Sequence, residues 1–188
     1  MTRPEWRSAI LAPLSTVAQQ TGIQIIAGIY ERDPPADLAF ALQAGSVPCS
    51  YAKRHLVPFL ETELTPGHAS GWLGNACAME ICKDMDFPRT ILGDAKSGIR
   101  LMGVPAGDFG KDAWLHARMA IMRGVENGFA IVRAADQGLL TASDAAGRLI
   151  AQKIAAPSGM TYSLPLSLSA QAPPSTPALV MPSPGASS

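Results

Sequence analysis

The hydrophobic positions of this chain form short apolar runs separated by turn residues, a pattern typical of buried strands. Proline, glycine and aspartate mark the turns, as in Asp33-Pro34-Pro35. A loop rich in threonine, proline and glycine is expected over 62–74. The pattern predicts strands over residues 23–30, 38–42, 47–53, 76–82, 99–104, 129–134, 139–143 and 148–153.

Two periodic stretches between these runs predict helices. The first covers 11–20 and ends at Gly22. The second covers 112–127, with Asp112 placed to cap its N-terminus and Gly128 to end it. One face of this second helix gathers three large apolar side chains, Trp114, Ile121 and Val125. Helices alternate with strands in the middle and strand pairs lie at both ends, which favours an α/β layered fold with mixed strand pairing.

Composition indicates one globular domain followed by a tail of different character. The apolar share is 47%, and fifteen basic side chains balance fifteen acidic ones. That balance gives no electrostatic basis for a nucleic-acid partner. After residue 156 proline, serine and alanine dominate and no charged residue occurs. We therefore expect a domain over 1–156 and a disordered tail over 157–188.

The uncharged stretch 8–30 has the length to cross a membrane, but its composition favours another interpretation. Pro13, three glutamines and Gly22 interrupt it, so we interpret it as a helix followed by a strand. An acidic residue, Glu5, lies where a secretory signal has its basic region. The sequence therefore predicts neither a transmembrane segment nor a signal peptide.

Cys82 is the first candidate for chemistry, because a thiol at the end of an apolar strand is held rigidly where a loop begins. Such a thiol is a nucleophile if a neighbour accepts its proton or lowers its pKa. The alternative is a buried structural cysteine. Cys49, in a hairpin arm, and Cys77, within the strand, fit that alternative better.

A second group of candidates lies in Tyr-Ala-Lys-Arg-His-Leu-Val-Pro-Phe-Leu-Glu, residues 51–61. Lys53 at a strand end can stabilise an oxyanion, and Glu61 can keep it charged and oriented, although a surface ion pair has the same signature. His55 is a rival base for Cys82. The other histidines are isolated and no Cys-x-x-Cys occurs, so we expect no metal and no cofactor.

Together and in this order, the segments resemble those of the nitrilase-like carbon–nitrogen hydrolases. The Pro-Glu-Trp around Glu5 resembles the segment of the general base, whose alternative is a first-turn helix acid. The segments of Lys53, Glu61 and Cys82 resemble those of the catalytic lysine, the supporting glutamate and the nucleophile. Several stretches within 107–148 are similar to the region after the nucleophile in apolipoprotein N-acyltransferases.

The resemblance implies an αββα sandwich and a Glu-Lys-Cys mechanism. Glu5 takes the proton of Cys82, and the thiolate attacks an amide or ester carbonyl to form a thioester. Lys53 and the backbone N–H of Lys83 hold the oxyanion. Glu61 orients Lys53, and the Lys83 side chain further lowers the pKa of the thiol. Water, or an amine acceptor, then resolves the thioester.

The sequence also departs from the family pattern. Members have a strand, a helix and a strand before the general base, and these are missing ahead of Glu5. We therefore expect a homodimer or a partner that supplies the missing elements. Lys83 and Asp84 stand where the acyltransferases have an aromatic residue and a glutamate, which argues against lipid-acyl substrates. Glu80 is unexpected in the nucleophile strand, because an unpaired buried carboxylate is costly.

Three functions stay open at this point: a hydrolase of a small amide, an acyltransferase, and a non-catalytic remnant that serves in binding or assembly. The location expected from this chain by itself is cytoplasmic. If the chain is part of a larger acyltransferase, the inner membrane facing the periplasm is expected instead.

Overall fold

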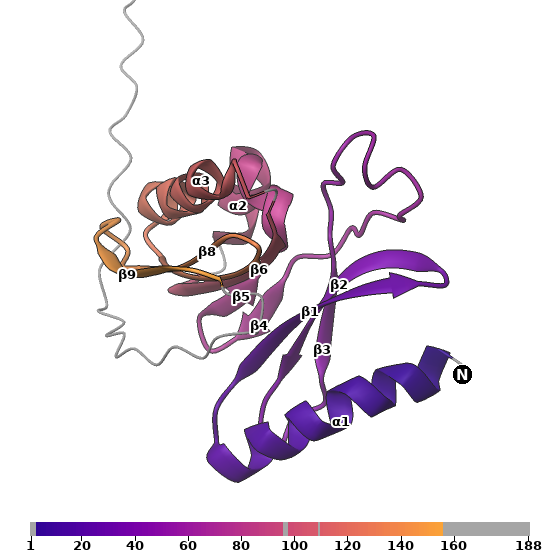
Figure 1. Cartoon of the computed structure of the whole chain (residues 1–188). Coiled ribbons are helices and arrows are strands. Elements are labelled where there is room, and N and C mark those ends of the chain that lie inside the picture. Colours follow the sequence, from indigo (N-terminus) through magenta and orange to yellow (C-terminus); the bar gives the residue numbers. More distant parts are fainter. Residues whose placement is uncertain (1–2, 96–97, 109, 156–188) are drawn as a thin grey trace, which may run out of the picture.

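The computed structural model describes residues 3–95, 98–108 and 110–155, and its layers are stacked as helix, sheet, sheet, helices (Figure 1). The first helix is α1 (Arg3–Thr21). It covers the outer face of a sheet of three antiparallel strands: β1 (Ile25–Arg32), β2 (Pro35–Leu42) and β3 (Cys49–Ala52). The predicted αββα sandwich is thereby confirmed for the described part of the chain.

The second sheet has six strands in sequence order. Three central strands run parallel and the outer pairs are antiparallel, so the predicted mixed pairing is also confirmed. The strands are β4 (Trp72–Gly74), β5 (Cys77–Met79), β6 (Leu101–Gly107), β7 (Ala130–Asp136), β8 (Leu139–Ser143) and β9 (Leu149–Ile154). The elements outside it are the short 3-10 helix η1 (Cys82–Asp86), α2 (Pro88–Ala95) and α3 (Ala113–Asn127).

Strand β2 is buried on both faces, which explains its nearly continuous apolar run. Successive side chains of a strand point to opposite faces. Leu38 and Phe40 face α1 and pack with Leu14 and Ala18. Ala39 and its odd-numbered neighbours face the second sheet. Residue 37, also odd-numbered, is therefore directed into the layer between the sheets.

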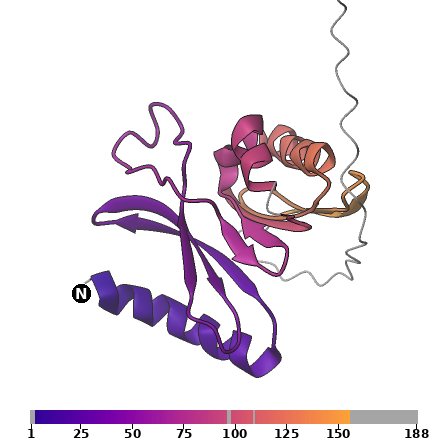
Figure 2. The same cartoon turned by 180° about the vertical axis from the view of Figure 1, so that it is seen from behind.

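The two sheets approach closely at two glycines. A Cβ added to Gly28 of β1 would lie 2.8 Å from Cβ of Pro105, and one added to Gly103 of β6 would lie 2.3 Å from Cδ1 of Ile26. Both strands therefore need a residue without a side chain at the contact. A segment between β3 and β4 loops away from the stacked layers, as the view from behind also shows (Figure 2).

Helix α3 differs from its prediction in two respects. It turns its small residues, among them Ala117 and Ala120, toward the second sheet, while Trp114 stays 59% exposed. Close packing of a helix on this sheet selects alanine over larger side chains. Asp112 occupies the N-cap position without a side-chain capping hydrogen bond, whereas Gly128 takes the predicted left-handed conformation with φ 75°.

Several predicted boundaries also move. Helix α1 begins well before residue 11, and strand β5 ends at Met79, three residues before Cys82. The predicted loop 62–74 contains β4 at its end. The predicted tail, 157–188, lies outside the described residues. Among the helices described, none combines the length and apolar character that a membrane crossing requires.

Candidate active site

A cavity of about 590 Å³ lies between the two sheets and joins three of the predicted site residues. Its floor and walls are mostly apolar, from β1, β6, β7 and Ile81. Six side chains with polar groups interrupt this lining: Tyr30, Asp37, Lys53, Glu61, Cys82 and Asp136. An apolar cleft with a few convergent polar groups is the usual form of a small-molecule site.

Cys82 lines the cavity as the first residue of η1, shortly after the end of β5. Its φ is +43°, an uncommon conformation for a residue with a side chain, and such residues cluster at functional sites. Its Sγ lies 3.6 Å from the carbonyl oxygen of Gly107, to which the thiol donates. Burial raises the pKa of the Cys82 thiol, and the positive charges of Lys53 and Arg133 offset this only in part. The thiol is therefore protonated at neutral pH and needs a proton acceptor to react.

Lys53 reaches the cavity from the residue after β3. Its Nζ lies 2.5 Å from Oε1 of Glu61 and 3.3 Å from Oδ2 of Asp37. Burial by itself lowers the pKa of Lys53, but the hydrogen bond to Glu61 and the charges of Asp37 and Cys82 outweigh it, so the pKa is raised. The ammonium group is held charged beside the thiol, as an oxyanion donor requires.

Glu5 and the Lys83 side chain are not brought into this cavity. Glu5 lies in the first turn of α1, on its exposed side, and is not among the cavity-lining residues. The ammonium group of Lys83 pairs with Asp86 at 3.0 Å. The cations that act most on the pKa of Cys82 are Lys53 and Arg133. These two side chains, and not that of Lys83, lower the pKa of the thiol.

His55, the rival base, is occupied by other contacts. Its Nδ1 lies 3.1 Å from Oδ1 of Asp84 and its Nε2 lies 3.2 Å from Oγ1 of Thr90. The ring also stacks on Phe87 with a centroid distance of 3.7 Å. His55 is not among the residues that line the cavity. The geometry therefore gives it a structural role and does not support a dyad with Cys82.

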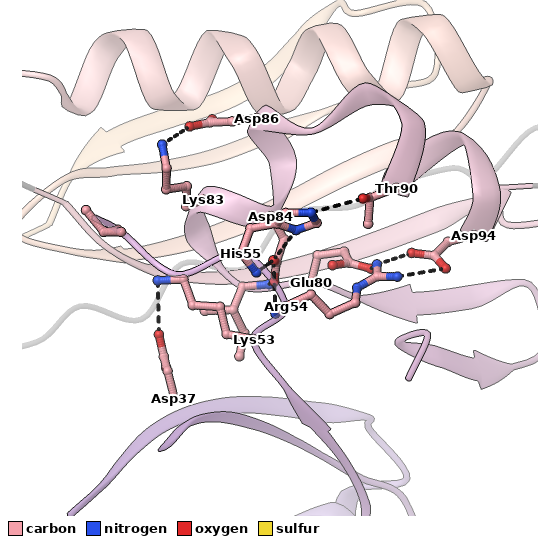
Figure 3. A network of polar contacts seen from close by, with 12 residues as sticks. Asp37, Lys53, Arg54, His55, Glu80, Lys83, Asp84, Asp86, Thr90 and Asp94 are labelled. Atoms are coloured by element: carbon pink, nitrogen blue, oxygen red, sulfur yellow. Dashed lines mark hydrogen bonds and ion pairs between the residues drawn. The ribbon is translucent and has the colours of Figure 1, made fainter. Parts of the chain in front are cut away.

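Glu80, which was unexpected in the predicted nucleophile strand, is part of a buried polar network (Figure 3). Glu80 accepts from the guanidinium of Arg54 and from the hydroxyl of Tyr51, which lies 2.6 Å from its Oε2. Arg54 also pairs with Asp94. Sequence reasoning missed this network because its members are far apart in the chain.

Asp84 links this network to the segment that begins with Lys53. Its carboxylate accepts from the backbone N–H groups of Arg54 and His55 at 3.1 and 2.7 Å, and from that of Ile81 at 3.2 Å. The same carboxylate lies 2.7 Å from the Tyr51 hydroxyl. These bonds fix the turn that carries Cys82 against the segment that begins with Lys53.

Two further polar features of the site were not predicted. Arg133 and Asp108 form a bidentate buried ion pair, with side chains 2% and 0% exposed, next to the Gly107 carbonyl. Asp37 lines the cavity beside Lys53. A sequence signal for Asp37 does exist, because a single charged residue inside an otherwise apolar strand is rarely there by chance.

Comparison with known proteins decides the family. The Carbon-nitrogen hydrolase family profile matches residues 2–162, most of the chain. The chain belongs to the carbon–nitrogen hydrolase family. A curated relative of this chain is the apolipoprotein N-acyltransferase of Methylococcus capsulatus, 28% identical over 176 residues. That match covers 76% of this chain and 34% of the relative, so the chain spans about a third of that protein's length.

Solved structures agree on the fold. Nit3 of Saccharomyces cerevisiae, a member of branch 10 of the nitrilase superfamily, superposes with a TM-score of 0.69 at 22% identity, covering 77% of this chain and 60% of Nit3. A carbon–nitrogen hydrolase from Helicobacter pylori G27 gives 0.68 at 16% identity, with 80% and 64% covered. An amidase from Nesterenkonia sp. gives 0.65 at 23% identity, with 78% and 63% covered. At these identities the likeness establishes the sandwich alone.

Proposed function

We propose that this chain transfers an acyl group from an amide or ester to the thiol of Cys82, as a thiol-dependent carbon–nitrogen hydrolase or N-acyltransferase. The observation that carries the proposal is that Cys82, Lys53 and Glu61 line one cavity, with Lys53 held at 2.5 Å from Glu61. A nucleophile, a fixed cation and the carboxylate that fixes it are the components that acyl transfer requires.

The steps follow from these positions. A base removes the proton of Cys82, and the thiolate attacks the carbonyl carbon. The charge that develops on the carbonyl oxygen is stabilised by Lys53 and by the backbone N–H of Lys83, the residue after the nucleophile. The carbon–nitrogen bond breaks with protonation of the leaving amine, and a thioester on Cys82 is left. Glu61 keeps Lys53 charged and oriented. The family resemblance implies Glu5 as the base, although Glu5 is not among the residues that line the cavity.

Two acceptors are compatible with this intermediate. Water gives a hydrolase, and an amine gives an acyltransferase. Relatives of both kinds support the proposal: the M. capsulatus acyltransferase by sequence and the Nesterenkonia amidase by fold. In a glutamate-to-glutamine mutant of that amidase, the acetamide moiety of fluoroacetamide is covalently added at the active-site cysteine. Product analysis with and without an added amine distinguishes the two functions for this chain.

The test is acylation of the purified chain by p-nitrophenyl acetate at neutral pH, followed as nitrophenolate release and mapped by mass spectrometry. We expect an acetyl group on Cys82 and its loss in Cys82→Ser. Lys53→Met should slow acylation by roughly 10²–10³-fold, the effect of removing one oxyanion donor. Lys111→Met, an exposed lysine outside the cavity, is the matched control and should leave the rate unchanged.

Cys49 provides an internal reference in the same sample, because it is exposed and lies outside the cavity. Its labelling reports ordinary thiol reactivity and should be equal in all variants. Equal labelling of Cys49 and Cys82, unaffected by Lys53→Met, would refute the enzymatic proposal and favour a non-catalytic binding module.

A further inference from the structure

A buried ion pair adjoins the part of the cavity wall that contacts the thiol. Cys82 donates its S–H to the carbonyl oxygen of Gly107, with 3.6 Å between Sγ and the oxygen. Asp108, the next residue along the chain, pairs with Arg133 of β7. Gly107 lines the cavity, whereas Asp108 and Arg133 do not. The ion pair can therefore act on the chemistry only through the wall, and not by touching a substrate.

The contacts of this pair fix the end of β6. Arg133 donates from Nη1 to Oδ2 of Asp108 at 2.9 Å and from Nη2 to Oδ1 at 2.5 Å. The same Nη1 lies 3.4 Å from the carbonyl oxygen of Leu139, at the start of β8. The backbone N–H of Asp108 donates to the carbonyl oxygen of Asp136 at 3.0 Å. Three strands are thereby joined at the residue that follows the acceptor of the thiol.

The space around the Asp108 carboxylate is closed. A Cβ added to Gly138 would lie 1.9 Å from Oδ2 of Asp108, so the backbone between β7 and β8 packs on the carboxylate. The side chains of Arg133 and Asp108 are 2% and 0% exposed. A buried ion pair is weak evidence for stability, because well-packed apolar residues of similar volume often serve as well. The position of this pair beside the nucleophile therefore needs another explanation.

We infer that Arg133 is a positioning residue for the nucleophile, an inference that deepens the proposed thiol mechanism and rests on it. Through Asp108 it fixes the Gly107 carbonyl that holds the thiol, and it brings a second positive charge to the sulfur, besides that of Lys53. When the base of the mechanism removes the proton of Cys82, both cations stabilise the negative charge left on sulfur. Asp108 opposes this effect, so the two members of the pair act on the thiol in opposite directions.

The direction of each effect is defined. Burial raises the pKa of the Cys82 thiol, Lys53 and Arg133 lower it in part, and Asp108 raises it. Removing the charge of Arg133 should therefore raise the pKa further, and removing that of Asp108 should lower it. A general loosening of the fold would admit water, relieve the burial and lower the pKa in both variants. Opposite shifts therefore distinguish an electrostatic role from a merely structural one.

Other ionisable groups surround the thiol and keep their identity in these variants. Those that line the cavity are Tyr30, Asp37, Lys53, Glu61 and Asp136. Those on and beside η1 are paired with one another, Lys83 with Asp86, and Arg54 with Glu80 and Asp94. Asp84 of η1 accepts from backbone N–H groups. Because none of these groups is replaced, differences among the variants report on Arg133 and Asp108.

The experiment measures alkylation of Cys82 by iodoacetamide in the full chain from about pH 6 to 10, mapped by mass spectrometry, with exposed Cys49 as the internal reference. The thiolate is the species that reacts, so the midpoint of the rate profile reports the pKa of the thiol. At neutral pH, Arg133→Gln should react roughly 3–10-fold more slowly than wild type and Asp108→Asn faster. The double variant should lie between them. Arg133→Lys keeps the charge and should stay near wild type.

Arg123→Gln is the matched control. Arg123 is also a buried arginine, with a side chain 7% exposed, but it pairs with Glu126 on α3 and lies outside the cavity. Its replacement should leave the alkylation profile of Cys82 unchanged. Acylation by p-nitrophenyl acetate should follow the same order as alkylation, and the deficit of Arg133→Gln should shrink as the pH rises through the pKa of its thiol.

The outcomes separate this inference from the proposed function. Shifts of the same direction in Arg133→Gln and Asp108→Asn, or no shift in either, overturn the inference, while acylation of wild-type Cys82 still supports the proposed function. Opposite shifts in a chain that the ester does not acylate support the charge assignment and overturn the proposed function.

An Arg133→Gln chain that does not fold is identified because its Cys82 then reacts like Cys49. In that case Asp108→Asn and Arg133→Lys decide. The inference requires a lower midpoint in Asp108→Asn and a midpoint near wild type in Arg133→Lys, and any other pair of results overturns it.

Discussion

Replacing Arg54 by methionine should destabilise the fold by roughly 3–5 kcal/mol at neutral pH, the usual cost of removing one partner of a buried ion pair. The structure supports the upper half of that range. Arg54 pairs with both Glu80 and Asp94, whose side chains are 0% and 6% exposed, and its own is 14% exposed. Its removal leaves two carboxylates with little access to water, and methionine keeps most of the apolar stem.

The loss should depend on pH in a definite direction. Without Arg54, the folded-state pKa of Glu80, which burial already raises, rises further. Stability from a raised carboxyl pKa is present below the unfolded value and is lost as pH rises through the folded value. Asp94 has a lowered pKa in the wild type, and the stability this gives is complete above its ordinary value of 3.8, so it is the same at pH 5 and pH 8. The further rise at Glu80 makes the difference between wild type and variant larger at pH 8 than at pH 5.

Urea denaturation followed by circular dichroism measures this difference. With a slope of about 2 kcal/mol/M, the midpoint should fall by roughly 2–2.5 M at pH 8. The matched control is the triple variant Arg54→Met, Glu80→Gln, Asp94→Asn, which removes the buried charges together and should recover much of the loss. A midpoint shift under about 0.5 M, or one of equal size at both pH values, would refute the reasoning.

Two further predictions concern packing and the second buried ion pair. Gly71→Ala should destabilise the chain by about 1–3 kcal/mol, because the new Cβ would lie 1.7 Å from the backbone oxygen of Met79. Gly93→Ala, at an exposed position of α2 with free space around it, should instead stabilise the chain by about 0.5–1 kcal/mol. Thermal melts should therefore show shifts of the melting temperature in opposite directions. Arg133→Met should lower the free energy of unfolding, measured by urea denaturation, by about 3–5 kcal/mol. The double variant Arg133→Met, Asp108→Asn should lower it clearly less. Equal losses would show that the pairing of these two charges does not stabilise the fold.

The sequence predicted the layers well and the site in part, for physical reasons that differ between elements. Apolar runs and turn residues determine strands locally, so β1, β2 and β6 were predicted close to where they lie. The end of β5 was misplaced because Glu80 and Ile81 continue a strand-like run, and only the distant Arg54 makes a buried turn possible there.

Side-chain direction was harder to predict than element type. Of the large apolar residues that suggested a core face of α3, Ile121 is buried but Trp114 and Val125 are exposed, because the close approach of the helix to the sheet favours small residues such as its alanines. Lys53 and Glu61 were paired correctly because they are close in sequence. Whether an acid reaches the thiol depends on which elements pack together, so the cavity position of Asp37 and the exposed position of Glu5 required coordinates.

The glycine contacts between the sheets have a consequence for reactivity. Cys82 is carried by the second sheet, whereas Asp37 and Lys53 are carried by the first. The separation of Cys82 from Lys53 is therefore set by how closely Gly28 and Gly103 allow the two sheets to approach. The spacing of two sheets is usually regarded as a property of core packing. Here it also sets the distance between the side chains that are proposed to react. A single methyl group at either glycine would change reaction geometry without touching any residue that reacts.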